Sequence, residues 1–207
     1  MNHATIPDKR SDPHPTYFVK VDDTSDTDLI RRAREGDSGA FRTLVERHEP
    51  RVAATVIGML GTGADAEDVG QEVFIRFHKA LDQFRGDAAV GTYLTRIAIN
   101  LSLNASGRRQ RSRLKFWSRD QEAAPPPEPA IDGRDIVDQA ARQEIVRWAI
   151  QQLQPDHRAV VVLRMMEEYS TKETAELLEL PEGTVLSRLS RGMARLKEIL
   201  QERGVEP

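Results

Sequence analysis

The sequence predicts an all-α protein made of two small helical units joined by a proline-rich linker. Three observations lead to this fold class. Apolar residues recur every three to four positions along most of the chain, and no alternating apolar–polar segment is bounded by hairpin turns. Residues 123–130 read AAPPPEPA, which cannot continue a helix and favours an extended polyproline conformation. We therefore expect a disordered tail over 1–26, a first unit over 27–113, an acidic linker over 114–135 and a second unit over 136–203.

In the first unit, helical patterning begins at Asp28, and the Gly36–Asp37 pair and Pro50 are expected to break residues 28–60 into short helices. Either Asp37 or Ser38 is suited to cap the second of these helices. A long helix is then expected over 64–84, because apolar residues from Val69 to Phe84 form one stripe. The Arg85–Asp87 turn ends that helix, and another is predicted from about Val90.

The second unit has a short helix, a tight turn and a longer final helix. Pro155 opens a helix, and Ser170 with Glu173 matches a capping box at the start of the next one. A turn over 180–182 leads to a last helix over 182–200, which has Val185, Leu189, Met193, Leu196 and Leu200 on its apolar face. This arrangement is typical of a helix-turn-helix, whose second helix enters the major groove. An ordinary helical hairpin is the alternative.

The polar face of the last helix has side chains suited to DNA. Arg188 has the guanidinium that pairs with guanine in two hydrogen bonds, and hydroxyl groups contact phosphate or base edges. The residues predicted to contact DNA on this helix are Thr184, Ser187, Arg188 and Arg191.

The composition excludes several classes of protein. The 207 residues contain no cysteine, so disulfide scaffolds, thiolate metal sites and cysteine nucleophiles are absent. No apolar run approaches the roughly 18 residues of a membrane span, and the N-terminus lacks an apolar signal segment. The five histidines have no metal-ligand spacing, and no phosphate loop or nucleophile elbow occurs. We expect a cytoplasmic protein without membrane contact, with no cofactor, metal or catalytic residues, and not an enzyme.

The formal net charge of −3 conceals an uneven distribution of charge. Residues 96–119 contain seven bases and no acid, whereas residues 120–138 contain six acids and one base. A basic cluster at a helix end is typical of phosphate contact. The same cluster is also explained by the helix macrodipole, which favours bases at a C-terminal turn.

Both units resemble the extracytoplasmic-function sigma factors of bacterial RNA polymerase. Region 2 of that family is similar to DLIRRAR at 28–34, AEDVGQEVF at 66–74, FRGD at 84–87, TYL at 92–94 and RIAIN at 96–100. Region 4 is similar to residues 169–175 and to LPEGTV at 180–185, followed by Ser187, Arg188 and Arg191. The resemblance covers about residues 28–203, and it has two separate motifs in the family's order.

The resemblance implies a site for core polymerase and a reader of the −10 element. Asp68, Gln71 and Glu72 match the family's contact with the β′ clamp helices. The helix from Val90 matches the element that captures a base flipped out of the stack. The residues implied to contact −10 DNA are Arg85, Thr92, Tyr93, Arg96, Asn100, Arg108 and Arg109. Tyr93 is equally well explained as a core residue.

The implied partners are core RNA polymerase, through its β′ clamp helices and β flap, promoter DNA and an anti-sigma factor. The chain would then recognise −35 duplex and capture −10 single strand as an alternative sigma factor. Leu186 stands where the family usually has Lys or Arg, and Gly192 where it usually has Ala. The tail has no assigned role.

Two rival functions remain at this point. A polymerase-independent helix-turn-helix transcriptional regulator would bind duplex DNA tightly alone, and a helical adaptor would have no use for the basic faces.

Overall fold

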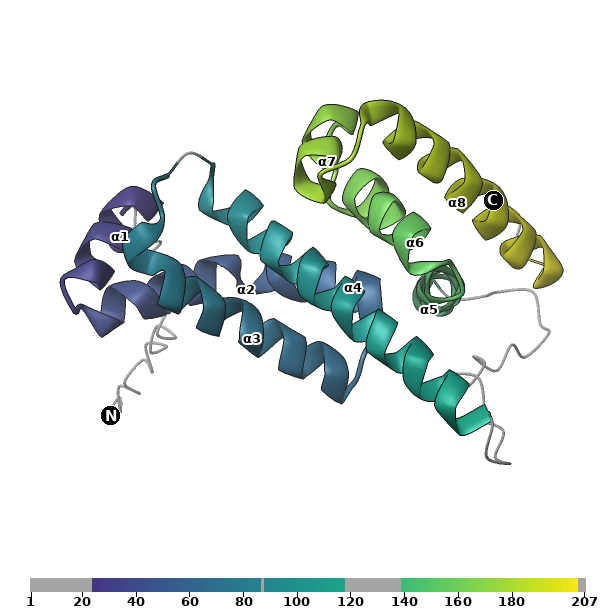
Figure 1. The fold of residues 1–207 in the computed structure, drawn as a ribbon, viewed down its shortest axis with the longest axis horizontal. Coiled ribbons are helices and arrows are strands. Elements are labelled where there is room, and N and C mark those ends of the chain that lie inside the picture. Colours follow the sequence, from purple (N-terminus) through teal and green to yellow (C-terminus); the bar gives the residue numbers. More distant parts are fainter. Residues whose placement is uncertain (1–23, 87, 118–138, 205–207) are drawn as a thin grey trace, which may run out of the picture.

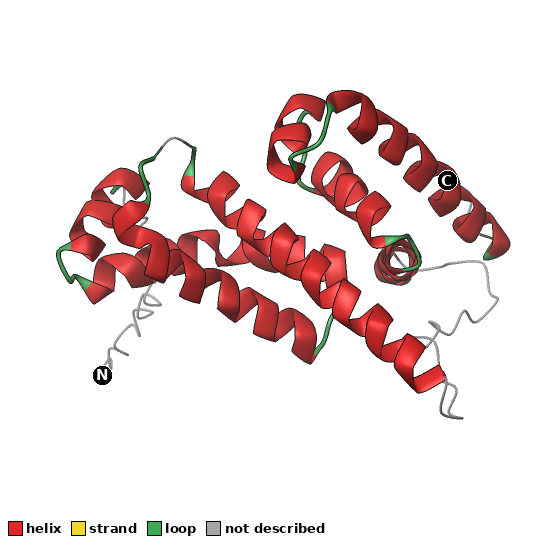
Figure 2. Cartoon of the chain, viewed as in Figure 1, coloured by secondary structure: helices red, strands yellow, loops and turns green. Residues whose placement is uncertain are grey.

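The structure, a computed structural model, describes residues 24–86, 88–117 and 139–204, and all regular structure among them is helical (Figures 1 and 2). Most of the predicted tail and most of the predicted linker lie outside the described residues, and Asp26, expected in the tail, is the first residue of the first helix. The helices are α1 Asp26–Arg34, α2 Ser38–Leu60, α3 Ala64–Ala80, α4 Val90–Trp117, α5 Gln139–Gln151, α6 Pro155–Val161, α7 Thr171–Leu178 and α8 Glu182–Glu202. A 3-10 turn, η1 Leu81–Gln83, follows α3, and a π-helical turn, η2 Val162–Met166, follows α6.

Side-chain caps define the starts of the first two helices. Ser25 accepts a hydrogen bond from the backbone N–H of Asp28 at 3.2 Å. Asp37 accepts one from the N–H of Ala40 at 3.1 Å, so Asp37 rather than Ser38 caps α2. The guanidinium of Arg32 and the backbone N–H groups of Ala40 and Gly39 lower the pKa of Asp37, because all of them favour the carboxylate.

The predicted break at Pro50 is wrong, because α2 is continuous from Ser38 to Leu60. A proline inside a helix costs about 3 kcal/mol through its missing N–H and its ring clash. Both halves of α2 are anchored in the core, by Leu44 before the proline and by Val52 and Val56 after it. Packing of these side chains therefore outweighs the local preference.

The long helix α3 ends at Ala80, a few residues before the end expected from its apolar stripe. Val69, Val73 and Phe77 are buried as predicted, and Leu81 is buried from the 3-10 turn that follows. The next helix begins at Val90 as predicted and continues to Trp117, past the boundary of the first unit expected at 113.

The second unit contains the predicted capping box. The N–H of Glu173 donates to Ser170 Oγ, and the N–H of Ser170 donates to Glu173 Oε2 at 2.7 Å. The hydroxyl of Ser170 and then its backbone N–H lower the pKa of Glu173, because both donate to the carboxylate and favour its ionised form. Met193, expected on the apolar face of α8, instead remains 38% exposed. Packing explains the glycine at position 192, because a Cβ there would lie 2.9 Å from Val161 Cγ2 in α6.

The two units share one continuous buried core. Helices α5, α6 and η2 pack on α2, and α6 and α7 lie beside α4 (Figure 1). The approach is close at Gly58 of α2, where a Cβ would lie 3.1 Å from Val162. The hydroxyl of Tyr169, just before α7, donates to Thr95 Oγ1 of α4 at 3.2 Å, and both residues are buried.

Arg158 of α6 is the polar centre of this contact between the units. Its side chain is buried and donates to the carbonyl of Met59 in α2 at 2.6 Å. It also donates to the carbonyls of Ile150 at 3.1 Å and Leu153 at 2.9 Å, at the end of α5. Burial, with a smaller effect of the nearby charge of Arg109, lowers the pKa of Arg158 to about 10, so the group stays protonated at neutral pH.

Replacing Arg158 is expected to destabilise the whole protein. Arg158→Ala leaves carbonyls of α2 and α5 without a donor in a buried position, so we expect a loss of more than about 2 kcal/mol in urea unfolding. Arg195→Ala is the control, because Arg195 is exposed and pairs with the exposed Glu198 at 3.0 Å. That change should cost less than about 0.5 kcal/mol. Equal losses for the two variants would contradict the role given to Arg158.

The carboxyl group of Glu167, directly after η2, is expected to make the stability of the folded protein depend on pH. Burial raises the pKa of Glu167, although Arg51 at 3.6 Å and a hydrogen bond from Thr55 partly oppose the shift. Ionised Glu167 therefore destabilises the folded state at neutral pH, and this penalty disappears once the carboxyl is protonated in both states. Glu167→Gln should raise Tm at pH 7, and the gain should vanish as the pH falls below about 4.5, the ordinary value. Glu168→Gln, at an exposed neighbour, should show no such gain at any pH.

Candidate functional site

The exposed face of α3 brings together the residues predicted to contact polymerase. Asp68 and Gln71 are exposed, Glu72 is half-buried, and their spacing places all three on one side of the helix, away from the core. Ile75, which the sequence reasoning missed, follows on the same side and is 46% exposed. An isoleucine three residues after Glu72 breaks the polar pattern of this face, and that break was readable in the sequence.

Glu72 is already paired within its own helix. Arg76 Nε donates to Glu72 Oε1 at 2.8 Å, and this hydrogen bond lowers the pKa of Glu72. The carboxylate is therefore ionised at neutral pH, and the α3 face presents acidic groups around an apolar side chain.

A polar row runs along α4. Thr92, Arg96, Asn100 and Arg108 follow at multiples of four residues, and each step of four turns about 40° around a helix of about 3.6 residues per turn. The row therefore winds around α4, with Asn100 near its middle and Thr92 and Arg108 on its two flanks. Arg96, Asn100 and Arg108 are exposed, and Thr92 is half-buried. Asn104, which was not among the predicted residues, is exposed in the same row. The residues predicted on α4 thus form a row of side chains that can donate hydrogen bonds.

Tyr93 lies beside this row, in an aromatic cluster. Its ring centroid is 5.1 Å from that of Phe84 and 6.0 Å from that of Phe77, and the rings are tilted or edge-on. These are ordinary packing geometries for aromatic side chains. The half-buried ring is therefore held in place by the core of the first unit, with part of its surface open to solvent.

The second unit covers part of the α4 row. Arg96 Nη2 donates to Glu179 Oε1 at 2.5 Å, across the two units. Glu179 is the C-cap residue of α7 and has the left-handed conformation, with φ 54°. It therefore lies at the start of the turn of the helix-turn-helix. Arg51 of α2 lies over the ring of Tyr169 at 5.9 Å, next to this contact.

Arg109 is engaged within the first unit. Its Nε donates to Asp65 Oδ2 at the start of α3, and its Nη1 donates to the carbonyl of Leu60 at 3.3 Å. Arg108 is exposed, and both arginines line a hollow of about 270 Å³ between α3 and α4. Arg108 therefore reaches solvent more freely than Arg109.

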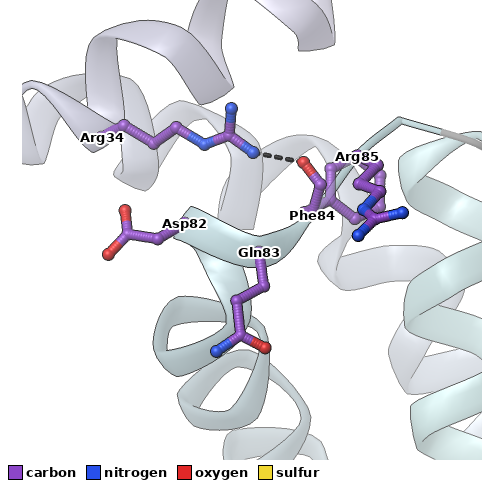
Figure 3. Close-up of a pocket in the computed structure, with 5 residues that line it drawn as sticks. All are labelled: Arg34, Asp82, Gln83, Phe84 and Arg85. Carbon is purple, nitrogen blue, oxygen red and sulfur yellow. Dashed lines mark hydrogen bonds between the residues drawn. The ribbon is translucent and has the colours of Figure 1, made fainter.

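Arg85 lies at a larger hollow beside the turn that follows η1. Figure 3 shows this hollow, of about 670 Å³, lined by Arg34, Asp82, Gln83, Phe84 and Arg85. Arg34 of α1 donates to the carbonyls of Leu81, at 2.9 Å, and Phe84, and so fixes the turn. Arg85 is exposed, whereas Arg34 was not foreseen because its partners are far away in sequence.

The four residues predicted on α8 have different environments. Ser187 and Arg191 are exposed, and Ser187 Oγ donates to the carbonyl of Thr184 at 3.0 Å. Thr184 is half-buried. Arg188 is only 26% exposed, and its Nη2 lies 3.0 Å from Asp156 Oδ2 of α6. Arg188 therefore has an intramolecular partner, and Arg191 is the more available cation.

The described residues contain no group of three or more His, Asp or Glu side chains placed to hold a metal ion. In the same part of the chain, no helix is long and apolar enough to cross a membrane.

The fold and these faces define a two-unit helical protein with a C-terminal helix-turn-helix, a class that binds DNA. Family models match both units: Sigma-70 region 2 over residues 44–112 and Sigma-70 region 4 over residues 143–196. The chain belongs to the sigma-70 family, as an alternative RNA polymerase sigma factor of the extracytoplasmic-function type.

Curated relatives support this assignment over most of the chain. The RNA polymerase sigma-H factor of Pseudomonas aeruginosa is 34% identical over 187 residues, which cover 85% of this chain and 94% of the relative. The ECF RNA polymerase sigma-E factor of Escherichia coli is 34% identical over 182 residues, covering 86% of this chain and 95% of the relative.

Solved structures show the same fold. The structure of CnrH in complex with the cytosolic domain of CnrY has 25% identity and a TM-score of 0.59, covering 86% of this chain and 99% of that one. The sigma factor RpoE of Bartonella quintana, in complex with the anti-sigma factor NepR, has 22% identity and a TM-score of 0.60. That match covers 78% of this chain and 96% of the other.

Proposed function

We propose that this chain directs promoter-specific initiation by binding core polymerase with α3, reading −35 duplex with α8 and capturing the −10 strand with α4. The observation that carries the proposal is the polar row on α4, because it lies on the same chain as a helix-turn-helix that can bind duplex DNA. A regulator that acts without polymerase needs the helix-turn-helix but has no use for that row. The chain carries out no chemical step of its own, and it works in the cytoplasm, where the polymerase is.

Core polymerase binds the α3 face in this proposal. Asp68, Gln71 and Glu72 supply hydrogen-bonding and acidic groups for the β′ clamp helices, and Ile75 adds apolar area at the centre of the contact. The β flap would bind the second unit, and the linker over 114–135 would connect the two contacts across the polymerase surface.

The −10 strand binds along α4. Asn100 has an amide that both donates and accepts hydrogen bonds at a base edge. Arg96 lies one turn before Asn100 and Arg108 about two turns after it, and both supply cations for backbone phosphates. Thr92, Tyr93, Arg85 and Arg109 are the further residues assigned to −10 DNA. Stacking and hydrogen bonds to an extruded base offset the few kcal/mol that unpairing costs.

The contact between Arg96 and Glu179 must break before this surface can hold DNA. Both side chains are well exposed, so the pair contributes about 1 kcal/mol or less and a phosphate can replace the carboxylate. Separation of the units on polymerase would free Arg96 and the helix-turn-helix together. An anti-sigma partner would act oppositely, by holding the units in the inactive arrangement.

Run-off transcription with core polymerase on a promoter library tests the function. We expect the chain to produce new start sites that core polymerase alone does not produce, and to bind promoter duplex weakly without polymerase. No new start sites, together with a strong footprint of the chain alone on duplex DNA, would favour the polymerase-independent regulator. No new start sites and no DNA binding of any kind would favour an adaptor.

Asn100→Ala tests the assignment of α4. Open-complex formation should fall about tenfold or more, because a base edge loses its hydrogen bonds, while initial promoter binding changes little. Permanganate reactivity of the −10 thymines measures opening. Gln201→Ala is the control, because Gln201 is an exposed amide near the end of α8, outside the surface proposed for the −10 strand, and it should open the promoter nearly as the unmodified chain does. Equal reactivity for Asn100→Ala and the unmodified chain would contradict the assignment.

A further inference from the structure

Leu186 is an exposed aliphatic residue in the first half of α8. Its side chain is 54% exposed, whereas its neighbour Val185 is fully buried and Leu189, one turn on, is half-buried. The core of the second unit is therefore made without Leu186. Scattered exposed leucines are common on protein surfaces, so the position of this one decides what it means.

The position is one at which a helix-turn-helix touches bases. Residues near the N-terminus of the second helix face the base edges in the major groove. Leu186 is the fifth residue of α8, which begins at Glu182. Of the exposed residues near it, Ser190 lies one turn further along the same side, and Ser187 is the next residue in the chain. An exposed apolar group thus lies in the same turns of α8 as the residues predicted to contact −35 duplex.

Thymine presents an apolar group, its C5-methyl, in the major groove, and aliphatic side chains pack against it. We infer that Leu186 contacts a thymine methyl in the −35 duplex and makes that thymine a determinant of promoter choice. The inference rests on the proposed function of α8 as the −35 reader. It assigns to this position a contact different in kind from the one that a lysine or arginine makes with phosphate or guanine.

Met193 provides a matched control on the same helix. It is 38% exposed and lies seven residues after Leu186. At about 1.5 Å per residue, Met193, the twelfth residue of α8, lies about 16 Å from the start of the helix. Because the major groove is about 12 Å wide, a residue that far from the helix start lies outside the reach of the bases. Met193→Ala removes similar exposed apolar surface without removing the proposed contact.

The test replaces each −35 thymine in turn by deoxyuridine, which keeps base pairing and removes the methyl group alone. Promoter affinity is measured for the holoenzyme containing the unmodified chain, Leu186→Ala or Met193→Ala, on a promoter that supports initiation. At one or two positions, deoxyuridine should weaken binding of the unmodified holoenzyme about fourfold, the effect of exposing one methyl-sized group. Leu186→Ala should lose this sensitivity, and Met193→Ala should keep it. Circular dichroism checks that both variants remain helical.

The possible failures are distinguishable. If the holoenzyme protects the −35 duplex and initiates, but deoxyuridine has no effect at any position, the inference is wrong and the proposed function stands. Unchanged sensitivity in Leu186→Ala also overturns the inference, and so does a −35 element that contains no thymine. If the holoenzyme initiates without protecting the −35 duplex, the assignment of α8 as the −35 reader fails, and the inference fails with it.

Discussion

The contact between the two helical units depends on one buried guanidinium. Arg158 joins the end of α5 to the end of α2 by donating to carbonyls of both, and so satisfies C-terminal carbonyl groups that a helix leaves unpaired. Burying a charge is costly unless hydrogen bonds compensate it, and Arg158 has acceptors for each of its nitrogens. Because the apolar core continues around this group, the positions of α6, η2 and α7 against α2 and α4 depend on it.

Several of the predicted DNA-binding cations are paired with carboxylates of the same chain. Arg96 is paired with Glu179 between the units, Arg109 with Asp65 within the first unit and Arg188 with Asp156 within the second. In the proposed function these carboxylates take the places of DNA phosphates, which agrees with our expectation that a chain of formal net charge −3 binds DNA weakly without polymerase. Exposed ion pairs are weak, so such pairing adjusts DNA binding without preventing it.

The sequence predicted local structure better than it predicted contact between the units. Periodicity located the helices, and Ser170 with Glu173 marked a start that the structure confirms. The helix break predicted at Pro50 is wrong, because the local cost of a proline does not include the packing of the residues on either side of it. Met59, the partner of Arg158 in α2, and the partners of Arg96 and Arg34 are distant in sequence, so no local pattern could indicate them. The closeness of Gly192 to Val161, which explains the glycine, is likewise a contact between separate helices.

We expect the free chain to be closed, with α7 against α4, and to open on polymerase. The sequence has no cysteine, so Glu46→Cys and Lys172→Cys, at exposed positions of α2 and α7, place one spin label on each unit. Double electron–electron resonance should give one narrow, short distance distribution for the free chain and a longer one after addition of core polymerase. The same distribution in both states would show that the chain does not open on polymerase. A broad, long distribution in the free chain would show that the free chain is not closed.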